Sequence, residues 1–410
     1  MERALVVFLA LASIAPAAEP TSIVHPPCSP ADSALDCAVL TNNLGSTYFA
    51  AGKYREAELL FTQAISLWST APAPPEDLAK AYHNLAAAYR MQERYVDAAR
   101  YYLRAIDLRE SLFGPFDLSL LPLLNELGLV YLELGDYAHA EEILQRAVAI
   151  IAAHQAEELP DSVAAINNLA LAYRQQGRFE DAEKLYRRAL AAYRRTSDLS
   201  NQVAVLNNLG QVLAERTEYK EAEQLDREAI AIAQQHFGSA DPGVAVVLSN
   251  LAKLLMERHK FSAAEPLLRR AEQIDRQNFP PDHTRIGYDL SNQGAVAVGR
   301  KRYADAERLY RQADAILEKA LPANHAELGK IVARLANVYR LEGRWTEAEG
   351  LFPRAIRILE QAWGPQSPQL IAVLESYEAV LRERQDYAEA ESVELRQTKI
   401  RVAEALRDPN

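Results

Sequence analysis

One pattern of apolar and polar positions recurs along the whole chain, and residues 167–189, NNLALAYRQQGRFEDAEKLYRRA, are its clearest copy. Within that copy the apolar positions are spaced by three and four residues, which places those of each half on one face of a helix. They are Leu169, Ala170 and Tyr173 before Gly177, and Phe179, Ala182, Tyr186 and Ala189 after it. Each copy therefore predicts two antiparallel helices that are joined by a short turn.

An aromatic residue after the turn marks each of nine copies, at steps of 40 to 42 residues. The nine residues are Tyr54, Tyr95, Tyr137, Phe179, Tyr219, Phe261, Tyr303, Trp345 and Tyr387. An alanine follows each of them by three residues, and a methyl group suits a position where two helices cross closely. A unit of this size cannot bury its own apolar face and must stack on its neighbours. The steady period therefore predicts one elongated all-α solenoid rather than several separate domains.

The order of small and large residues in each copy resembles the tetratricopeptide repeats. In the third copy the matching residues are Leu127, Gly128, Tyr131, Gly135, Tyr137, Ala140, Leu144 and Ala147. The period of about 42 and connectors such as FGPFD (113–117) and WGPQSP (363–368) resemble the kinesin light chain subgroup. The resemblance covers residues 35–400 and implies a right-handed superhelix of about nine helix pairs, with the last pair as a degenerate cap. It also implies a protein that binds other proteins.

The first residues, MERALVVFLALASIAPAA, resemble a secretory signal peptide, with an apolar run followed by small residues. We therefore expect a signal at 1–18 and an exported protein, periplasmic or secreted. An uncleaved N-terminal membrane anchor is the alternative, and no later stretch has the ~20 apolar residues that a spanning helix needs. Prolines predict an extended leader over residues 19–34, and residues 401–410 are expected to form a frayed tail.

Cys28 and Cys37 are the only two cysteines of the chain. In an exported protein they can pair. However, Ser29 and Pro30 are suited to start a helix at once, and nine helical residues span about 13 Å, beyond the ~7 Å reach of a disulfide. Either the helix starts later, near Ser33, or the thiols remain apart.

Composition and motifs point away from nucleic acid, anionic membranes and catalysis. The net charge of -11 argues against partners that require concentrated Lys and Arg. The eight histidines are scattered, and no pair has metal-ligand spacing on one helix. His283 and His325 occupy one connector position, 42 residues apart, which marks a feature of the repeat. Acidic runs such as EDAE are interpreted as solvated helix faces. We expect no enzyme, no metal and no cofactor.

Asparagines on the first helices are the main candidates for binding a partner. The position before the leucine of the repeat pattern holds an amide in six copies, at Asn43, Asn84, Asn168, Asn208, Asn250 and Asn292, and Asn167 and Asn207 extend this strip. An amide donates and accepts at once, so such a ladder can bind the backbone of an extended peptide. The other interpretation is that these amides bond neighbouring helices or water.

Five cations are candidates for a groove that accepts an acidic or carboxylate-bearing segment: Arg90, Arg174, Lys330, Arg334 and Arg340. The resemblance implies a clamp for a terminal carboxylate at Asn292, Lys330 and Arg334. The preceding repeat departs from that clamp, because it holds Ser249 where a lysine is expected and Lys253 where an asparagine is expected.

Two copies depart from the pattern. Glycines at 287, 294 and 299 predict a weak helix in the seventh copy. Glu378, Glu394 and Gln397 replace small or apolar residues in the ninth copy, which is expected of an outer face that no further repeat covers. As a whole the sequence predicts a non-enzymatic protein-interaction scaffold. The alternative is a structural or self-assembling component of an envelope or secretion complex.

Overall fold

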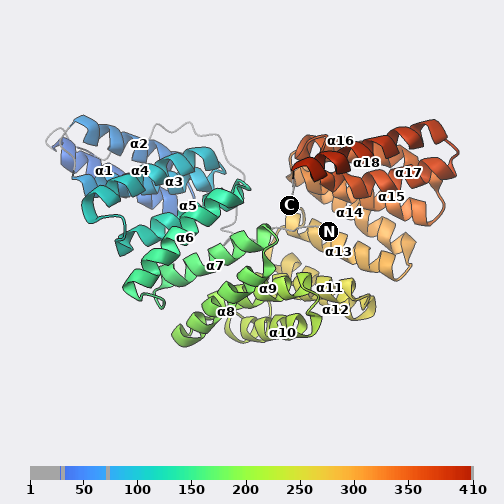
Figure 1. The fold of residues 1–410 in the computed structure, drawn as a ribbon, viewed down its shortest axis with the longest axis horizontal. Coiled ribbons are helices and arrows are strands. Elements are labelled where there is room, and N and C mark those ends of the chain that lie inside the picture. The colour runs from blue at the N-terminus through green and yellow to red at the C-terminus, as the bar shows by residue number, and fades with distance from the viewer. Residues whose placement is uncertain (1–27, 29–32, 71–73, 408–410) are drawn as a thin grey trace. The chain divides into compact units, whose positions relative to one another are not determined.

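The computed structural model describes residue 28 and residues 33–70 and 74–407, and that part of the chain is built from α-helices and two short 3-10 helices (Figure 1). It falls into two compact units, one ending at Glu218 and the other beginning at Tyr219. The helices of the first unit are α1 (Ala34–Ala50), α2 (Tyr54–Thr70), α3 (Pro75–Met91), α4 (Tyr95–Phe113), η1 (Leu118–Leu120), α5 (Leu121–Glu133), α6 (Tyr137–His154), α7 (Pro160–Gln175), α8 (Phe179–Thr196) and α9 (Leu199–Glu215).

The second unit continues the alternation of first and second helices. Its members are α10 (Tyr219–His236), α11 (Pro242–Glu257), α12 (Phe261–Asn278), α13 (Thr284–Gly299), α14 (Tyr303–Ala320), α15 (Ala326–Leu341), α16 (Trp345–Trp363), η2 (Pro368–Leu370), α17 (Ile371–Glu383) and α18 (Tyr387–Arg407). The last helix continues beyond residue 400, where the array was expected to end. None of the described helices combines the length and the apolar character needed to cross a bilayer. The predicted signal and most of the leader lie outside the described residues.

The predicted pairing of helices is confirmed. Each of the nine aromatic residues is the first residue of a second helix, from Tyr54 in α2 to Tyr387 in α18. The alanine three residues later is fully buried in every copy, at Ala57, Ala98, Ala140, Ala182, Ala222, Ala264, Ala306, Ala348 and Ala390. Two residues before each aromatic, the turn takes a positive φ, as at Gly177 (78°) and Thr217 (64°). The repeat is thus defined by one turn geometry and one close helix crossing.

The glycines of α13 are packing positions. An added Cβ would lie 2.6 Å from Leu317 at Gly287, 2.6 Å from Tyr310 at Gly294 and 2.3 Å from Phe261 at Gly299. A large side chain from a second helix therefore occupies the space that a methyl group would take. The prediction of a weak helix considered propensity alone, and this packing opposes the cost of the glycines.

The connector histidines act as helix caps. His283 Nδ1 accepts a hydrogen bond from the backbone N–H of Arg285, and His325 Nδ1 accepts one from Glu327, both at 3.2 Å. One repeat earlier Asp241 Oδ1 does the same for Gly243 at 2.7 Å. Side-chain acceptors at this position satisfy a donor in the first turn of the next helix.

At the N-terminal end, α1 begins at Ala34, and Ser33 caps it by accepting from the N–H of Asp36 at 3.1 Å. Cys28 precedes the helix and is joined to Cys37 by a disulfide, with the two Cα atoms 5.3 Å apart. The later start near Ser33 is therefore the arrangement that the structure has, and it brings the two sulfur atoms within reach.

The polar replacements of the ninth repeat differ in exposure: the expectation that they cover its outer face is wrong for Gln397, which is buried, whereas the Glu394 side chain is 55% exposed. Gln397 is 2% exposed, and its Nε2 donates to Glu378 Oε2 at 2.9 Å. Arg382 joins Glu378 to Glu394 through contacts of 2.7 Å each. A polar network therefore joins the two helices of this repeat.

Candidate functional site

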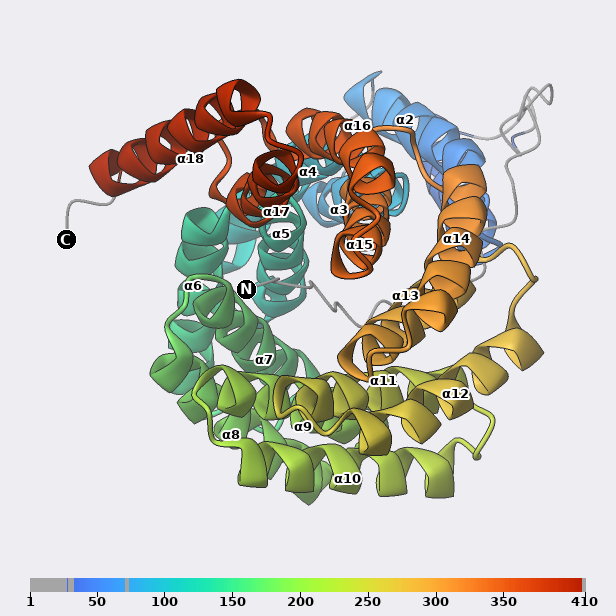
Figure 2. The same ribbon diagram turned by 90° about the vertical axis from the view of Figure 1, so that its right-hand side faces the viewer.

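First helices of successive repeats contact one another and form a face in each unit. In the first unit α1 contacts α3, α5 contacts α7, and α7 contacts α9. In the second unit α11 contacts α13 and α15 contacts α17, and Figure 2 labels these four helices. We call the surface in each unit its first-helix face: α1, α3, α5, α7 and α9 in the first unit, and α11, α13, α15 and α17 in the second. The candidate asparagines and cations all lie on these helices.

Amides on the first-helix face bond across the repeats. Asn84 Nδ2 donates to Asn42 Oδ1 at 3.2 Å, and Asn168 Nδ2 donates to Asn125 Oδ1 at 2.6 Å. Each bond joins a first helix to the first helix of the preceding repeat. The interpretation in which the amides bond neighbouring helices therefore holds for these positions.

Burial divides the ladder into two groups. Asn168 and Asn208 are each 7% exposed and Asn207 is fully buried, so these amides belong to the packing between repeats. Asn43 is exposed, and the remaining candidates, Asn84, Asn167, Asn250 and Asn292, are half-buried. This second group is therefore the part of the ladder that stays accessible at the surface.

The side chain of Asn167 has one polar atom with a hydrogen-bond partner and one without. Its Nδ2 donates to Asn168 Oδ1 at 3.2 Å, whereas its own Oδ1 has no hydrogen-bond partner among the described residues. This oxygen atom is itself buried, so its missing hydrogen bond costs free energy within the fold.

Three of the candidate cations have acidic or tyrosine partners. Arg90 Nε lies 3.1 Å from Glu126 Oε2. Arg174 lies beside the hydroxyl of Tyr186, where burial raises the pKa of that tyrosine and the Arg174 charge opposes the rise. Lys330 Nζ lies 2.7 Å from Glu327 Oε1.

The other cations are also held within the repeat array. Arg334 Nη1 donates to Ser291 Oγ at 2.7 Å, and Arg340 Nε donates to Asn337 Oδ1 at 2.9 Å. The positions of the implied carboxylate clamp therefore lie on α13 and α15, but Glu327 neutralises the lysine.

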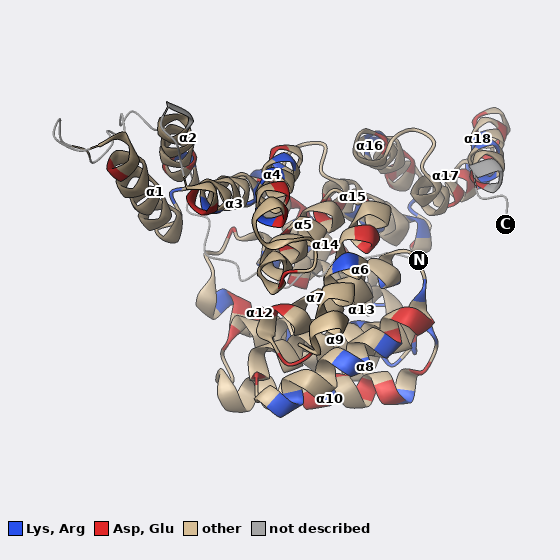
Figure 3. Cartoon of the chain, turned by 60° about the vertical axis from the view of Figure 1, so that its left-hand side comes forward, with Lys and Arg blue, Asp and Glu red and all other residues tan. Residues whose placement is uncertain are grey.

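A ladder of ion pairs joins successive repeats, and the sequence analysis missed it. A glutamate directly after the buried alanine pairs with an arginine in the turn of the next repeat. The distances are 2.9 Å for Glu58–Arg94, 2.8 Å for Glu141–Arg178, 2.7 Å for Glu307–Arg344 and 2.9 Å for Glu349–Arg384, and Glu183–Arg216, Glu223–Arg258 and Glu265–Arg300 form the same contact. Figure 3 shows the mixture of acidic and basic residues along second helices such as α8 and α10.

The exception in this ladder supports its role. The second repeat has Ala99 where the glutamate is expected, and the turn of the third repeat, Leu134–Asp136, contains no arginine. At this boundary between repeats the glutamate and its arginine partner are therefore both absent. The Ala-Glu dipeptide and the arginine about 36 residues later are both visible in the sequence, but the interpretation of the acidic runs as solvated helix faces overlooks their pairing.

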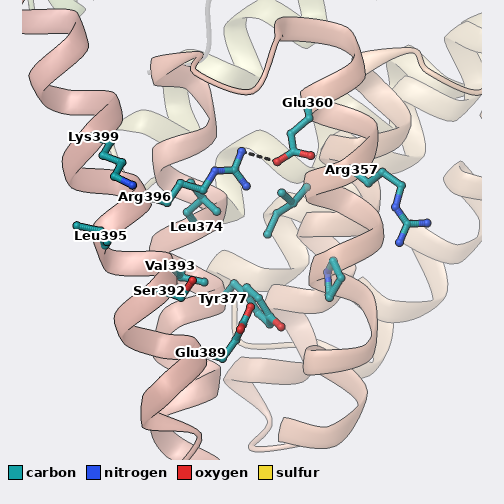
Figure 4. A pocket seen from close by; sticks show the side chains of 12 residues that line it. Arg357, Glu360, Leu374, Tyr377, Glu389, Ser392, Val393, Leu395, Arg396 and Lys399 are labelled. Carbon is teal, nitrogen blue, oxygen red and sulfur yellow. Dashed lines mark ion pairs between the residues drawn. The ribbon is translucent and has the colours of Figure 1, made fainter.

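A hollow of about 590 Å³ lies between α16, α17 and α18, away from every candidate residue (Figure 4). Its apolar lining includes Ile356, Leu374 and Tyr377. Basic and acidic side chains also line it, and Arg396 forms an ion pair with Glu360 there. The hollow depends on the relative placement of three helices, which no local sequence signal reports.

Buried carboxyl groups cluster between α12 and α13. Arg285 Nε lies 2.8 Å from Asp275 Oδ2, and Asp289 is 5% exposed. Burial and the neighbouring Asp275 raise the pKa of Asp289 to about 8. Throughout the described ranges no three His, Cys, Asp or Glu side chains are placed to hold a metal ion.

Comparison with known proteins places these features in a family context. The mitochondrial import receptor subunit TOM70 of Rattus norvegicus is 38% identical over 76 residues, which are 18% of this chain and 12% of that protein. The apo form of the quorum sensor NprR from B. thuringiensis has a TM-score of 0.61 at 14% identity, covering 79% of this chain and 87% of that one. This likeness concerns the fold alone.

A putative kinesin light chain with nearly identical TPR-like repeats from Podospora anserina is 23% identical, with a TM-score of 0.45, and covers 50% of this chain and 96% of that one. The family model described as "Tetratricopeptide repeat" matches residues 77–153, 161–235, 243–319 and 330–396, and a second model of that description matches residues 37–71. These matches cover well over half of the chain and agree in phase with the observed helix pairs. The protein belongs to the tetratricopeptide repeat family.

Proposed function

We propose that the protein is a non-enzymatic interaction scaffold that binds a segment of another protein on the first-helix face. The observation that carries this proposal is the recurrence of half-buried amides at one register, at Asn84, Asn250 and Asn292, with the half-buried Asn167 one position earlier in its repeat. An extended segment presents backbone donors and acceptors to such groups, and side-chain pockets add specificity.

The name of one similar protein agrees with a binding role. TOM70 is named as a receptor subunit, and this name describes recognition. The chain spans only 12% of the matched receptor's length, so no partner is transferred from it.

The charge of the partner is the finer part of the proposal. An acidic segment would bind near Lys330 and Arg334 by displacing Glu327 from the lysine. Binding of that kind weakens with added salt, because exposed charges are screened. A peptide that binds equally well at low and high salt would contradict the acidic preference and leave the scaffold proposal intact.

The test begins with selection of peptides from a random displayed library on the full-length chain. Replacing Asn84 and Asn167 by Ala is expected to weaken the selected peptide at least about tenfold, since two amide contacts of roughly 1 kcal/mol each are removed. Lys184→Ala is the matched control, because this side chain is exposed on the second helix α8. Unchanged affinity in the double variant would refute the role of the amides.

We also propose that the protein is exported, either periplasmic or secreted. The apolar N-terminal run and the disulfide between Cys28 and Cys37 support this location, since disulfides persist in oxidising compartments. Cell fractionation with mass measurement under non-reducing conditions tests it. A cytoplasmic chain with two free thiols would contradict the proposal.

A further inference from the structure

Hydrogen bonds in the interior of each unit show which side of a second helix faces the next repeat. Counted from the aromatic, position 8 contacts the following first helix: Gln145 Nε2 donates to the Tyr173 hydroxyl at 3.0 Å, and Arg311 Nη2 donates to the Tyr339 hydroxyl at 2.6 Å. Position 4 holds the glutamate of the ion-pair ladder in the repeats that form it. Positions 4 and 8 therefore mark the side of a second helix that packs against the next repeat, which we call the stacking side.

In α18 the stacking side is exposed. Position 4 is Glu391, position 8 is Leu395 and position 15 is Val402, and the two apolar side chains are 56% and 53% exposed. With Ala388 and Lys399 they form what we call the outer face of α18: Ala388, Glu391, Leu395, Lys399 and Val402. Leu395 and Lys399 lie at the edge of this face, because they also line the hollow between α16, α17 and α18. An exposed leucine and valine on a stacking side indicate a surface that is suited to cover by another helix.

The charges on this face differ from those around it. Glu394 is paired with Arg382 at 2.7 Å, and Arg401 is paired with Glu375 at 2.6 Å. Glu391 and Lys399 form no ion pair with any residue in the described part of the chain. The outer face therefore keeps one free acid and one free base, each four residues from Leu395.

We propose that the outer face of α18 binds the same face of a second copy of this chain, with the two helices antiparallel about a two-fold axis at Leu395. In that register residues equally far before and after Leu395 face each other. Leu395 meets Leu395 of the second copy, Glu391 meets Lys399 of the second copy, and Ala388 meets Val402 of the second copy. Each unlike pair occurs twice.

The self-complementary order of charges favours a second copy over an unrelated partner. A two-fold interface requires that residue i contacts residue j and that j contacts i. Acid and base at equal distances on either side of a central leucine satisfy this requirement, and a small residue faces a large one at both ends. Glu391 would gain the cationic partner that its counterparts in earlier repeats find in the next turn.

One helix face forms a small interface, so the pairing is weak and concentration-dependent. It uses none of the candidate residues of the first-helix face, and peptide binding can therefore succeed or fail independently of it. This inference goes beyond the proposed scaffold function and specifies how two such scaffolds would be joined.

The first experiment is cysteine capture in the full-length chain. The two native cysteines are joined to each other, so Leu395→Cys introduces the one free thiol. Mild oxidation is expected to give a disulfide-linked dimer, because two-fold related residues at the axis lie within the ~7 Å that a disulfide requires. Val96→Cys, at a 65% exposed position on α4, is the control and should form dimer much more slowly. Equal rates for the two variants would overturn the proposal.

The second experiment tests the register by exchanging charges. Glu391→Lys and Lys399→Glu each place like charges together and should weaken the dimer in sedimentation equilibrium. The double exchange restores unlike pairs and leaves the net charge unchanged, so it should recover the original dissociation constant. Single variants that behave as the parent chain would refute the charge pairing, and failure of the double exchange to recover would refute the antiparallel register.

Discussion

Asn168 shows how burial changes the role that a residue can have. Asn168 and Asn208 match the binding position in sequence, but both are 7% exposed, and Asn168 donates to Asn125 across the repeat boundary. Replacement by alanine removes a donor and leaves the buried acceptor of Asn125 without a partner. We therefore expect Asn168→Ala to lower the free energy of unfolding by about 1–3 kcal/mol, measured by urea denaturation. If the variant keeps its stability but loses peptide binding, Asn168 contacts the peptide and its role in packing is refuted.

Two glycines provide a matched pair for separating propensity from packing. At Gly294 an added Cβ would lie 2.6 Å from Tyr310, whereas at Gly350 nothing lies within 4 Å. Gly350→Ala is expected to raise the free energy of unfolding by up to ~1 kcal/mol, because alanine favours a helix. Gly294→Ala is expected to lower it by about 1–3 kcal/mol through overpacking. Thermal unfolding of the two variants checks this, and shifts of the same sign would contradict it.

Asp289 should make stability depend on pH. Its pKa is raised to about 8, first by burial and then by Asp275, while Arg285 opposes the rise and Glu272 adds to it. The protonated form is therefore favoured in the folded state, and stability should fall as pH rises from about 4 towards 8. Asp289→Asn removes this titration and should flatten the profile of unfolding midpoint against pH. A variant with the slope of the parent chain would exclude Asp289 as its source.

At the level of elements, the helix pairs were predictable because one aromatic and one buried alanine recur in phase. The ion-pair ladder was not recognised, because Glu141 or Glu307 read alone is indistinguishable from a solvated residue on a helix. Its partner lies in the next repeat, so the signal is a correlation over about 36 residues. The burial of Asn168 and the hollow near Tyr377 were not predictable, since both depend on how closely particular helices approach.

Two substitutions can introduce the ion pair that the ladder lacks between the second and third repeats. Ala99→Glu supplies the acid, and Leu134→Arg supplies the base at the turn position of Arg216 and Arg258. The two substitutions together should be more stabilising than the sum of their separate effects, by roughly 0.5–1 kcal/mol. A double-mutant cycle by urea denaturation measures this coupling, and raised salt should reduce it. Strict additivity would show that the ladder contributes no coupling between repeats.

At the scale of the whole molecule, the chain divides between Glu218 and Tyr219, inside the fifth repeat. Position 7 after the aromatic holds a large buried residue in most repeats, such as Phe61, Tyr102 and Tyr186. In the fifth repeat this position is Asp226, which is 3% exposed and whose Oδ1 has no hydrogen-bond partner among the described residues. Burial raises its pKa to about 7. A carboxyl group at a core position is expected to weaken the packing of this repeat.

Unfolding of the chain should therefore occur in two steps at pH 8, because a solenoid is stabilised by nearest-neighbour interactions and separates where they are weakest. Asp226→Leu restores an apolar residue at the core position and should merge the two calorimetric transitions into one. Lower pH should have the same effect in part, because the raised pKa favours the neutral carboxyl group as pH falls below about 7. Asp305→Leu, at an exposed acid on α14, is the control and should leave two transitions. A single transition in the parent chain at pH 8 would show that the fifth repeat transmits cooperativity despite its buried acid.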